Sequence, residues 1–151
     1  MGIMRFFAEK GHEAVGIATA SLAIRKATKK AAGRGLQVQF LVLNALALSR
    51  LKRKFDTAID SGLFHTPSGE DRPAFVKNLA AVLKPGGRYL MLCFSDLEPG
   101  EYPLPGRITQ REIRDTFRAG WSINYIRPAI FESRIDGHRA WLSSISRAMQ
   151  S

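Results

Sequence analysis

Short apolar runs alternate with segments of helical spacing along most of the chain. Runs rich in β-branched and aromatic residues predict strands, whereas apolar residues three or four positions apart predict helices. The predicted strands cover residues 13–18, 36–43, 55–60, 88–94, 121–127 and 139–147. Helices are predicted over residues 4–10 and 21–32, and after Ser68 and Thr109. This alternation, ending in two successive strands, predicts an α/β fold with a mostly parallel sheet and a carboxyl-terminal antiparallel hairpin.

Two of the predicted helices begin at capping-box sequences, in which a hydroxyl residue is followed three positions later by an acidic one. Ser68 precedes Asp71 with this spacing, and Thr109 precedes Glu112. The sequence Lys-Pro-Gly-Gly at residues 84–87 cannot continue a helix, so we expect it to end the first of the two and to turn into the next strand.

The length of 151 residues is that of one ordinary domain, so we predict a single domain over residues 1–151. The one cysteine, Cys93, excludes a disulfide framework within the chain, and its apolar neighbours predict a buried, inert thiol. The three histidines lie far apart in the sequence, so no metal site is predicted. No apolar run approaches the ~20 residues of a membrane span, and no secretory signal is evident, which predicts a cytoplasmic protein.

Lysine and arginine (23) outnumber aspartate and glutamate (13), which gives a net charge of +10. No acidic residue lies between Glu13 and Asp56. A basic nucleic-acid-binding module, with its patch at residues 50–54, is therefore one alternative. No aromatic residue interleaves with these charges for base stacking, so a solvated loop is the favoured interpretation of this segment.

The sequence LKPGGRYLML at residues 83–92, following FDTAIDSGLFH at residues 55–65, resembles the class I S-adenosylmethionine-dependent methyltransferases. The similarity extends from about Phe6 to Arg147. It implies a Rossmann-like methyltransferase fold and S-adenosylmethionine as the cofactor. The implied reaction is methyl transfer to a small-molecule acceptor that the sequence does not identify. The oligomeric state is not indicated.

The resemblance also implies a set of residues bordering the cofactor, all placed at or just after the carboxyl ends of predicted strands. These residues are Ala18, Thr19, Asn44, Ala45, Asp60, Ser61 and Leu63. His65 would face the acceptor and take a proton as the methyl group arrives, because an imidazole titrates near neutral pH. Two alternatives stay open: His65 is a loop imidazole bonded to a backbone carbonyl, and Asp60 caps the loop that follows it.

The chain departs from the family pattern at the cofactor motifs. Family members begin with a strand and a glycine-rich loop, but no strand precedes residues 4–10 here, which predicts an amino-terminally truncated or degenerate member. The acidic residue that binds the ribose is replaced by Ala18, and the aspartate facing adenine by Asn44, whose amide oxygen can still accept a hydrogen bond. We therefore expect weak or lost cofactor binding, and a non-catalytic remnant of the fold is the alternative to an active enzyme.

Overall fold

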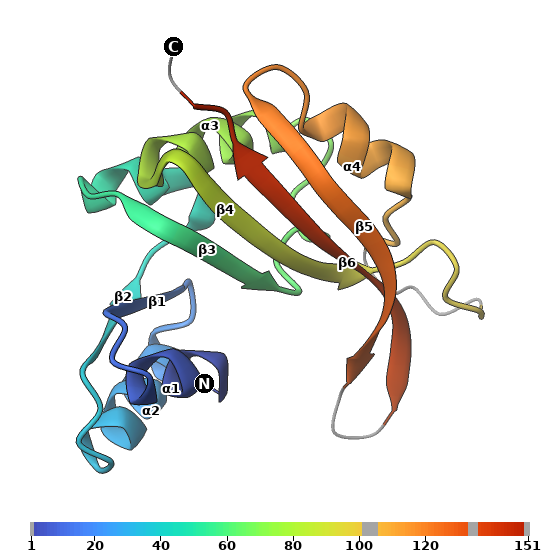
Figure 1. Ribbon diagram of the computed structural model, residues 1–151. Helices are drawn as coiled ribbons and strands as arrows, with labels where there is room; N and C mark the ends of the chain where they lie inside the picture. Colours follow the sequence, from blue (N-terminus) through green and yellow to red (C-terminus); the bar gives the residue numbers. More distant parts are fainter. Residues whose placement is uncertain (1, 101–105, 133–135, 150–151) are drawn as a thin grey trace. The chain divides into compact units, whose positions relative to one another are not determined.

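The computed structural model describes residues 2–100, 106–132 and 136–149. Within it the chain forms two compact units, Met1–Leu48 and Ser49–Ser151 (Figure 1). Each unit has its own sheet, and no strand of one sheet pairs with a strand of the other among the described residues.

The first unit is a parallel β-α-β arrangement preceded by a helix. Its elements are α1 (Gly2–Glu9), β1 (Ala14–Ala18), α2 (Ser21–Ala32) and β2 (Val38–Val42), followed by the 3₁₀ helix η1 (Ala45–Leu51). The two strands pair in parallel, from Ala14 opposite Val38 to Ala18 opposite Val42. Two parallel neighbours need a crossover, and α2 provides it, as the alternation of patterns predicted.

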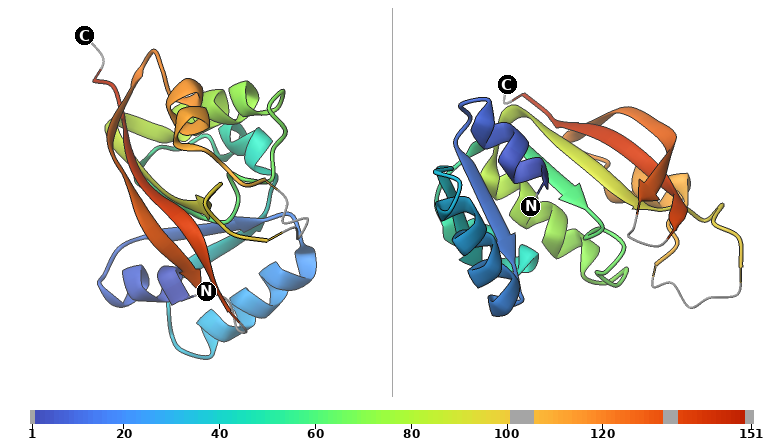
Figure 2. Two further views of the ribbon diagram at one scale, coloured as in Figure 1. Left: turned by 90° about the vertical axis from the view of Figure 1, so that its right-hand side faces the viewer. Right: turned by 90° about the horizontal axis from the view of Figure 1, so that it is seen from below.

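The second unit contains a four-stranded sheet with two helices on one of its faces (Figures 1 and 2). Its elements are β3 (Phe55–Ser61), α3 (Arg72–Val82), β4 (Leu83–Phe94), α4 (Gln110–Thr116), β5 (Trp121–Glu132) and β6 (Gly137–Arg147). The strand order is β3-β4-β6-β5. β3 and β4 are parallel, whereas the β4–β6 and β6–β5 pairs are antiparallel. The predicted α/β class with an antiparallel carboxyl-terminal hairpin is confirmed.

The segment at residues 84–87 differs from its prediction as a turn before a strand. β4 already begins at Leu83, which is fully buried and pairs with Phe55. The next pair joins Thr57 to Arg88, so the Lys-Pro-Gly-Gly segment forms an irregularity inside a longer strand. The strand starts before the two glycines because Leu83 is buried and pairs with β3. The local sequence could not indicate this contact with another strand.

The core of the second unit lies between the sheet and the two helices and is largely aromatic. Phe64, Phe75, Tyr89 and Phe117 are buried, with neighbouring ring centroids 5.7–6.4 Å apart. These separations fall in the range that aromatic pairs prefer. Cys93 lies in the same layer and is fully buried, and burial raises the pKa of its thiol to about 12, as expected for an unreactive cysteine.

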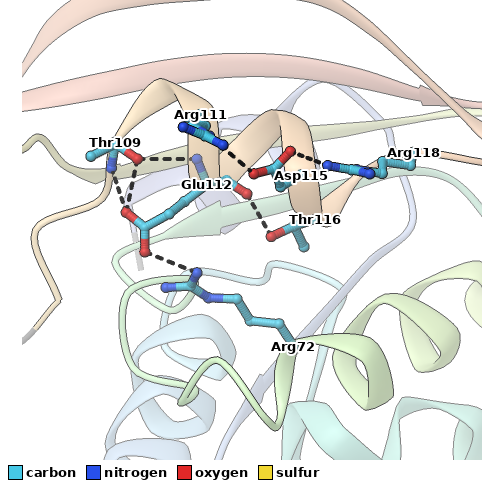
Figure 3. Close-up of polar contacts among 7 residues, drawn as sticks. All are labelled: Arg72, Thr109, Arg111, Glu112, Asp115, Thr116 and Arg118. Carbon is cyan, nitrogen blue, oxygen red and sulfur yellow. Dashed lines mark hydrogen bonds and ion pairs between the residues drawn. The ribbon is translucent and has the colours of Figure 1, made fainter.

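The amino terminus of α4 carries the capping box expected from the sequence (Figure 3). The Glu112 backbone N–H donates to Thr109 Oγ1 at 3.0 Å, and the Thr109 N–H donates to Glu112 Oε2 at 2.8 Å. The other oxygen of Glu112 accepts from Arg72 Nη1 at 3.1 Å, which ties α4 to the start of α3. Before α3, the Asp71 N–H donates to the Ser68 hydroxyl at 3.3 Å, as in a capping box, and this hydroxyl donates to the Asp71 carboxylate at 2.9 Å. The helix itself begins only at Arg72, and Asp71 makes no side-chain cap bond to it.

We expect Glu112→Ala to lower the free energy of unfolding by about 1–3 kcal/mol. The substitution removes a helix cap and leaves the Arg72 guanidinium, which is only 16% exposed, without its carboxylate. Asp115→Ala is the control, because Asp115 pairs with Arg111 and Arg118 on the solvent side of the same helix (Figure 3). That change should cost less than about 0.5 kcal/mol. Chemical denaturation measures both, and equal losses would contradict the assignment.

Candidate active site

In the first unit, the predicted cofactor residues lie at the carboxyl ends of the two parallel strands. The Leu43 N–H donates to the Ala18 carbonyl at 3.0 Å, which continues the strand pairing and keeps these two ends side by side. Asn44 follows at once, and its Oδ1 accepts the Leu46 N–H at 2.8 Å. The side chain therefore caps the start of η1 and is held at this edge of the sheet.

Two further predicted residues complete this edge of the first unit. Thr19 directly follows β1 and is exposed, whereas Ala45 is buried at the start of η1. Thr19 and Asn44 thus supply the polar side chains among the four positions that the sequence singled out in this unit.

In the second unit, Asp60 is a buried carboxylate at the end of β3, only 7% exposed. Its Oδ1 accepts the Leu63 N–H at 2.7 Å, and its Oδ2 accepts the Phe64 N–H at 2.9 Å and the Tyr89 hydroxyl at 2.7 Å. Burial raises the pKa of Asp60, and the three donors oppose that shift. Both oxygens are engaged within the protein, which supports the alternative that Asp60 caps the following loop. Direct contact with a cofactor stays a prediction.

The loop after β3 leaves the sheet through a glycine. Ser61 ends the strand and is exposed, and Leu63 is 37% exposed. Between them the Gly62 N–H donates to the Leu92 carbonyl at 2.9 Å, and Gly62 has a φ of +89°, a conformation that side chains other than glycine rarely adopt. Ser61 and Leu63 are thus exposed on either side of a fixed turn at the carboxyl edge of β3 and β4.

His65 follows on the same loop and is half-buried. Its imidazole stacks on the ring of Phe94, with centroids 4.6 Å apart and an interplanar angle of 21°. Its Nδ1 is buried without a hydrogen-bond partner, and no backbone carbonyl of the described residues accepts a bond from the ring. Burial lowers the pKa of His65 below its usual 6.5, so the imidazole is neutral at pH 7 and can accept a proton.

Phe94, on which His65 stacks, has two further ring neighbours that the sequence analysis did not single out. The Phe94 ring also lies 4.9 Å from that of Phe131 and 5.6 Å from that of His138. Phe131 and His138 are directly opposite each other across the β5–β6 hairpin. The register of the β5–β6 hairpin is the signal that could have placed Phe131 opposite His138. No local sequence pattern, however, places either residue near the loop after β3.

Among residues 2–100, 106–132 and 136–149, no group of three or more His, Cys, Asp or Glu side chains could hold a metal ion. No helix in these residues is long and apolar enough to cross a membrane.

Comparison with known proteins identifies the fold around these residues. The profile of a family described as a methyltransferase domain matches residues 2–87, more than half of the chain. The chain belongs to this family. The class I S-adenosylmethionine-dependent methyltransferase family suggested by the sequence is therefore confirmed.

Individual members of the family agree with this assignment. The chain is 33% identical, over 134 residues, to 2-heptyl-1-hydroxyquinolin-4(1H)-one methyltransferase of Mycobacteroides abscessus. That match covers 87% of this chain and 59% of the relative, so the chain spans about three fifths of the relative's length.

Solved structures give the same fold. One structure, which concerns the conversion of a disulfide bond into a thioacetal group during echinomycin biosynthesis, is 30% identical with a TM-score of 0.84. It covers 97% of this chain and 71% of its own. A methyltransferase of Methanosarcina mazei described as S-adenosylmethionine-dependent is 21% identical with a TM-score of 0.80, and the match covers 97% of this chain and 87% of that one.

We expect Tyr89→Phe to lower the free energy of unfolding by about 1–3 kcal/mol at pH 7, because it removes a hydrogen bond to the buried Asp60 carboxylate. Burial raises the folded-state pKa of Asp60, so its ionised form, which most needs the hydroxyl, is populated only above that raised pKa. The loss should therefore be larger at pH 7 than at pH 4.

Tyr125→Phe is the matched control for this pH dependence. The Tyr125 ring is partly exposed and lies under the Arg127 guanidinium, 4.2 Å from it. Urea denaturation of the two variants and the parent at both pH values measures the difference. A Tyr89→Phe loss that is the same at pH 4 and pH 7 would contradict the proposed support of the carboxylate.

Proposed function

We propose that this chain transfers a methyl group from S-adenosylmethionine to a small-molecule acceptor. Family membership supports the cofactor, and the named substrate of the Mycobacteroides abscessus relative supports a small acceptor. The observation that carries the proposal is His65, a half-buried imidazole that is neutral at pH 7 and lies at the carboxyl edge of parallel strands. Doubly wound sheets bind their ligands at this edge.

The residues at the carboxyl edge of the first unit fit the adenosine part of the cofactor through neutral hydrogen bonds. Asn44 is fixed by its bond to Leu46, and its amide keeps a free lone pair and donors for adenine. The exposed Thr19 hydroxyl can bond a ribose hydroxyl where Ala18 offers no acceptor. When bound, the cofactor supplies an electrophilic methyl group on a sulfonium. A hydrogen bond between neutral groups is about half as strong as one to a charged group. Neutral partners at Thr19 and Asn44 therefore support a weaker affinity for the cofactor than acidic residues would give.

The part played by the protein is to orient the acceptor and to take its proton. A methyl group is received most easily by an atom that loses a proton in the same step, and a positioned imidazole can accept it. The loop carrying His65 is fixed by the Asp60 carboxylate, which binds the two backbone N–H groups just before the histidine. We propose His65 as the general base on this ground.

We also propose that the two compact units belong to one domain over residues 1–151, because the match to a solved structure covers 97% of this chain. The free, buried cysteine supports a reducing cytoplasm. The nucleic-acid alternative draws little support from residues 50–54. Lys54 donates to the Ala81 carbonyl at 3.1 Å, and the Arg53 guanidinium lies 4.9 Å from the Phe55 ring. Two of the basic side chains in this segment therefore contact the protein itself.

Calorimetric titration with S-adenosylmethionine and S-adenosylhomocysteine tests cofactor binding, and transfer to 2-heptyl-1-hydroxyquinolin-4(1H)-one tests activity. We expect His65→Gln to lower kcat by about 10²–10⁴-fold while the cofactor Kd is unchanged, because the base acts on the acceptor. His12→Gln, in the other unit, is the control and should change neither quantity. Because burial lowers the pKa of His65, the rate should fall only as the pH drops below about 6.5.

The outcomes separate the two classes of function. Binding of neither cofactor would favour the non-catalytic alternative. Cofactor binding and methyl transfer that persist undiminished in His65→Gln would refute the role of this histidine.

A further inference from the structure

We propose that the groove between α1 and α2 in the first unit binds a single-chain anionic amphiphile, of the chemical class of a fatty acid. The groove has a volume of about 330 Å³ and is lined by residues of both helices and of the two strands beneath them. The inference does not rest on the methyl-transfer function, since it requires neither the cofactor nor His65.

The walls and floor of the groove are mostly apolar. Met4 comes from α1, Ala23 and Ile24 come from α2, and Phe40 comes from β2. Both helices lie on the same face of the β1–β2 pair (Figures 1 and 2). Binding sites for small molecules are concave, with mainly apolar linings and a few polar groups that fix the orientation of the ligand. The groove has the lining of such a site and a volume at the lower end of the usual range.

Gly16 keeps the floor of the groove open. It pairs with Phe40 across the two strands. A Cβ added at Gly16 would lie 2.7 Å from the Phe40 ring and 3.7 Å from Met4 Sδ. Any side chain at this position would displace the ring or enter the groove, so the glycine allows Phe40 to lie against β1 and form part of the floor.

Two lysines give the groove a positive rim. Lys26 and Lys30 are one turn apart on α2, and both are exposed and line the groove. Neither side chain forms an ion pair or a hydrogen bond within the part of the chain that the structure describes. No acidic residue is among the described residues of the lining, and the sequence has none between Glu13 and Asp56. An apolar hollow with uncompensated positive charge at its rim complements a ligand that has an apolar body and an anionic end.

The distribution of charge on α2 favours a single-chain ligand over a flat anionic surface. Arg25 and Lys29 are also exposed on this helix, but they do not line the groove. A flat surface would contact such outward side chains, whereas Lys26 and Lys30 border a hollow in which an alkyl chain can leave water. Each methylene that is fully buried strengthens binding by about fourfold, so the hollow adds a contribution that charge alone does not provide.

The methionine methyl groups allow a direct test by NMR of the full chain. Met4 lines the groove, Met91 is fully buried in the second unit, and Met149 is 75% exposed. The chain is titrated with monomeric dodecanoate at about 0.15 M salt, where distant charges are screened. We expect the Met4 signal to shift along a saturable curve while the Met91 signal stays unchanged. The Met149 signal measures adsorption to exposed apolar side chains and should not follow the Met4 curve.

Two further probes separate the contributions of the chain and the charge. Octanoate keeps the carboxylate on a shorter chain and should bind at least about tenfold more weakly than dodecanoate. Dodecyltrimethylammonium keeps the chain and reverses the charge, so it should bind at least about fivefold more weakly.

Paired charge variants locate the anionic end of the ligand. Lys26→Gln combined with Lys30→Gln should weaken dodecanoate binding by about five- to thirtyfold. Arg25→Gln combined with Lys29→Gln is the matched control, because it removes the same charge from the same helix outside the groove. That control should change the affinity by less than about twofold.

A second pair of variants locates the alkyl chain. Ala23 lines the groove and is exposed, so Ala23→Phe should fill the hollow and abolish the saturable Met4 shift. Ala32→Phe, at an exposed position of the same helix outside the groove, should leave the shift unchanged. Thermal melting checks that each variant is folded.

Several results would overturn the inference. A Met4 signal that does not saturate, or a Met149 signal that shifts along the same curve, would exclude a defined site. Equal weakening by the two double charge variants would indicate diffuse attraction to a basic surface. A Met4 shift with vesicles of phosphatidylcholine and phosphatidylserine, but none with dodecanoate, would assign the surface to a membrane.

The cofactor provides the last discrimination, because Ala18 also lines the groove. Displacement of dodecanoate by S-adenosylhomocysteine would assign the groove to the cofactor and overturn the inference. Saturable dodecanoate binding by a chain that transfers no methyl group would support the groove and refute only the proposed function.

Discussion

A buried carboxylate has to be given hydrogen-bond donors, and much of the second unit is arranged to supply them to Asp60. Two donors are backbone N–H groups of the next loop, and the third is the Tyr89 hydroxyl in the middle of β4. Removing donors from a buried charge costs several times what an exposed ion pair contributes. The hydrogen bonds of Asp60 therefore couple the direction of the loop after β3 to the core. They also couple the position of His65, which lies on that loop, to the core.

β4 connects the parts of this arrangement, because its alternate residues serve different purposes. The aromatic core contains the fully buried Tyr89, Met91 and Cys93. Phe94, at the end of the strand, instead stacks against the His65 imidazole. The strand also changes the character of the sheet, since it pairs in parallel with β3 and antiparallel with β6. Parallel pairing places the loop after β3 beside the end of β4, and antiparallel pairing brings the hairpin to the same place.

The sequence predicted what depends on local spacing and did not predict what depends on register. The helix over residues 21–32 and the capping box of Thr109 and Glu112 follow from periodicity and short-range hydrogen bonds, and both were correct. The bulge at residues 84–87 depends on the burial of Leu83 against another strand, so local turn chemistry gave a different boundary. The contacts of Phe94 with His65 and with two rings of the β5–β6 hairpin depend on three strand registers at once, none of which a single sequence determines.

In the proposed reaction, the stacking of His65 on Phe94 meets two demands that otherwise conflict. Before the transfer, burial against an apolar ring disfavours the charged imidazole and keeps it a free base at neutral pH. After it takes a proton, the imidazolium lies 4.6 Å from the face of the same ring, where the negative quadrupole of an aromatic face stabilises a cation by about 0.5–2 kcal/mol. The Phe94 ring thus disfavours protonation of His65 by excluding water. Once His65 is protonated, the same ring partly offsets the cost of burying the charge. An aliphatic side chain at this position would provide the first effect without the second.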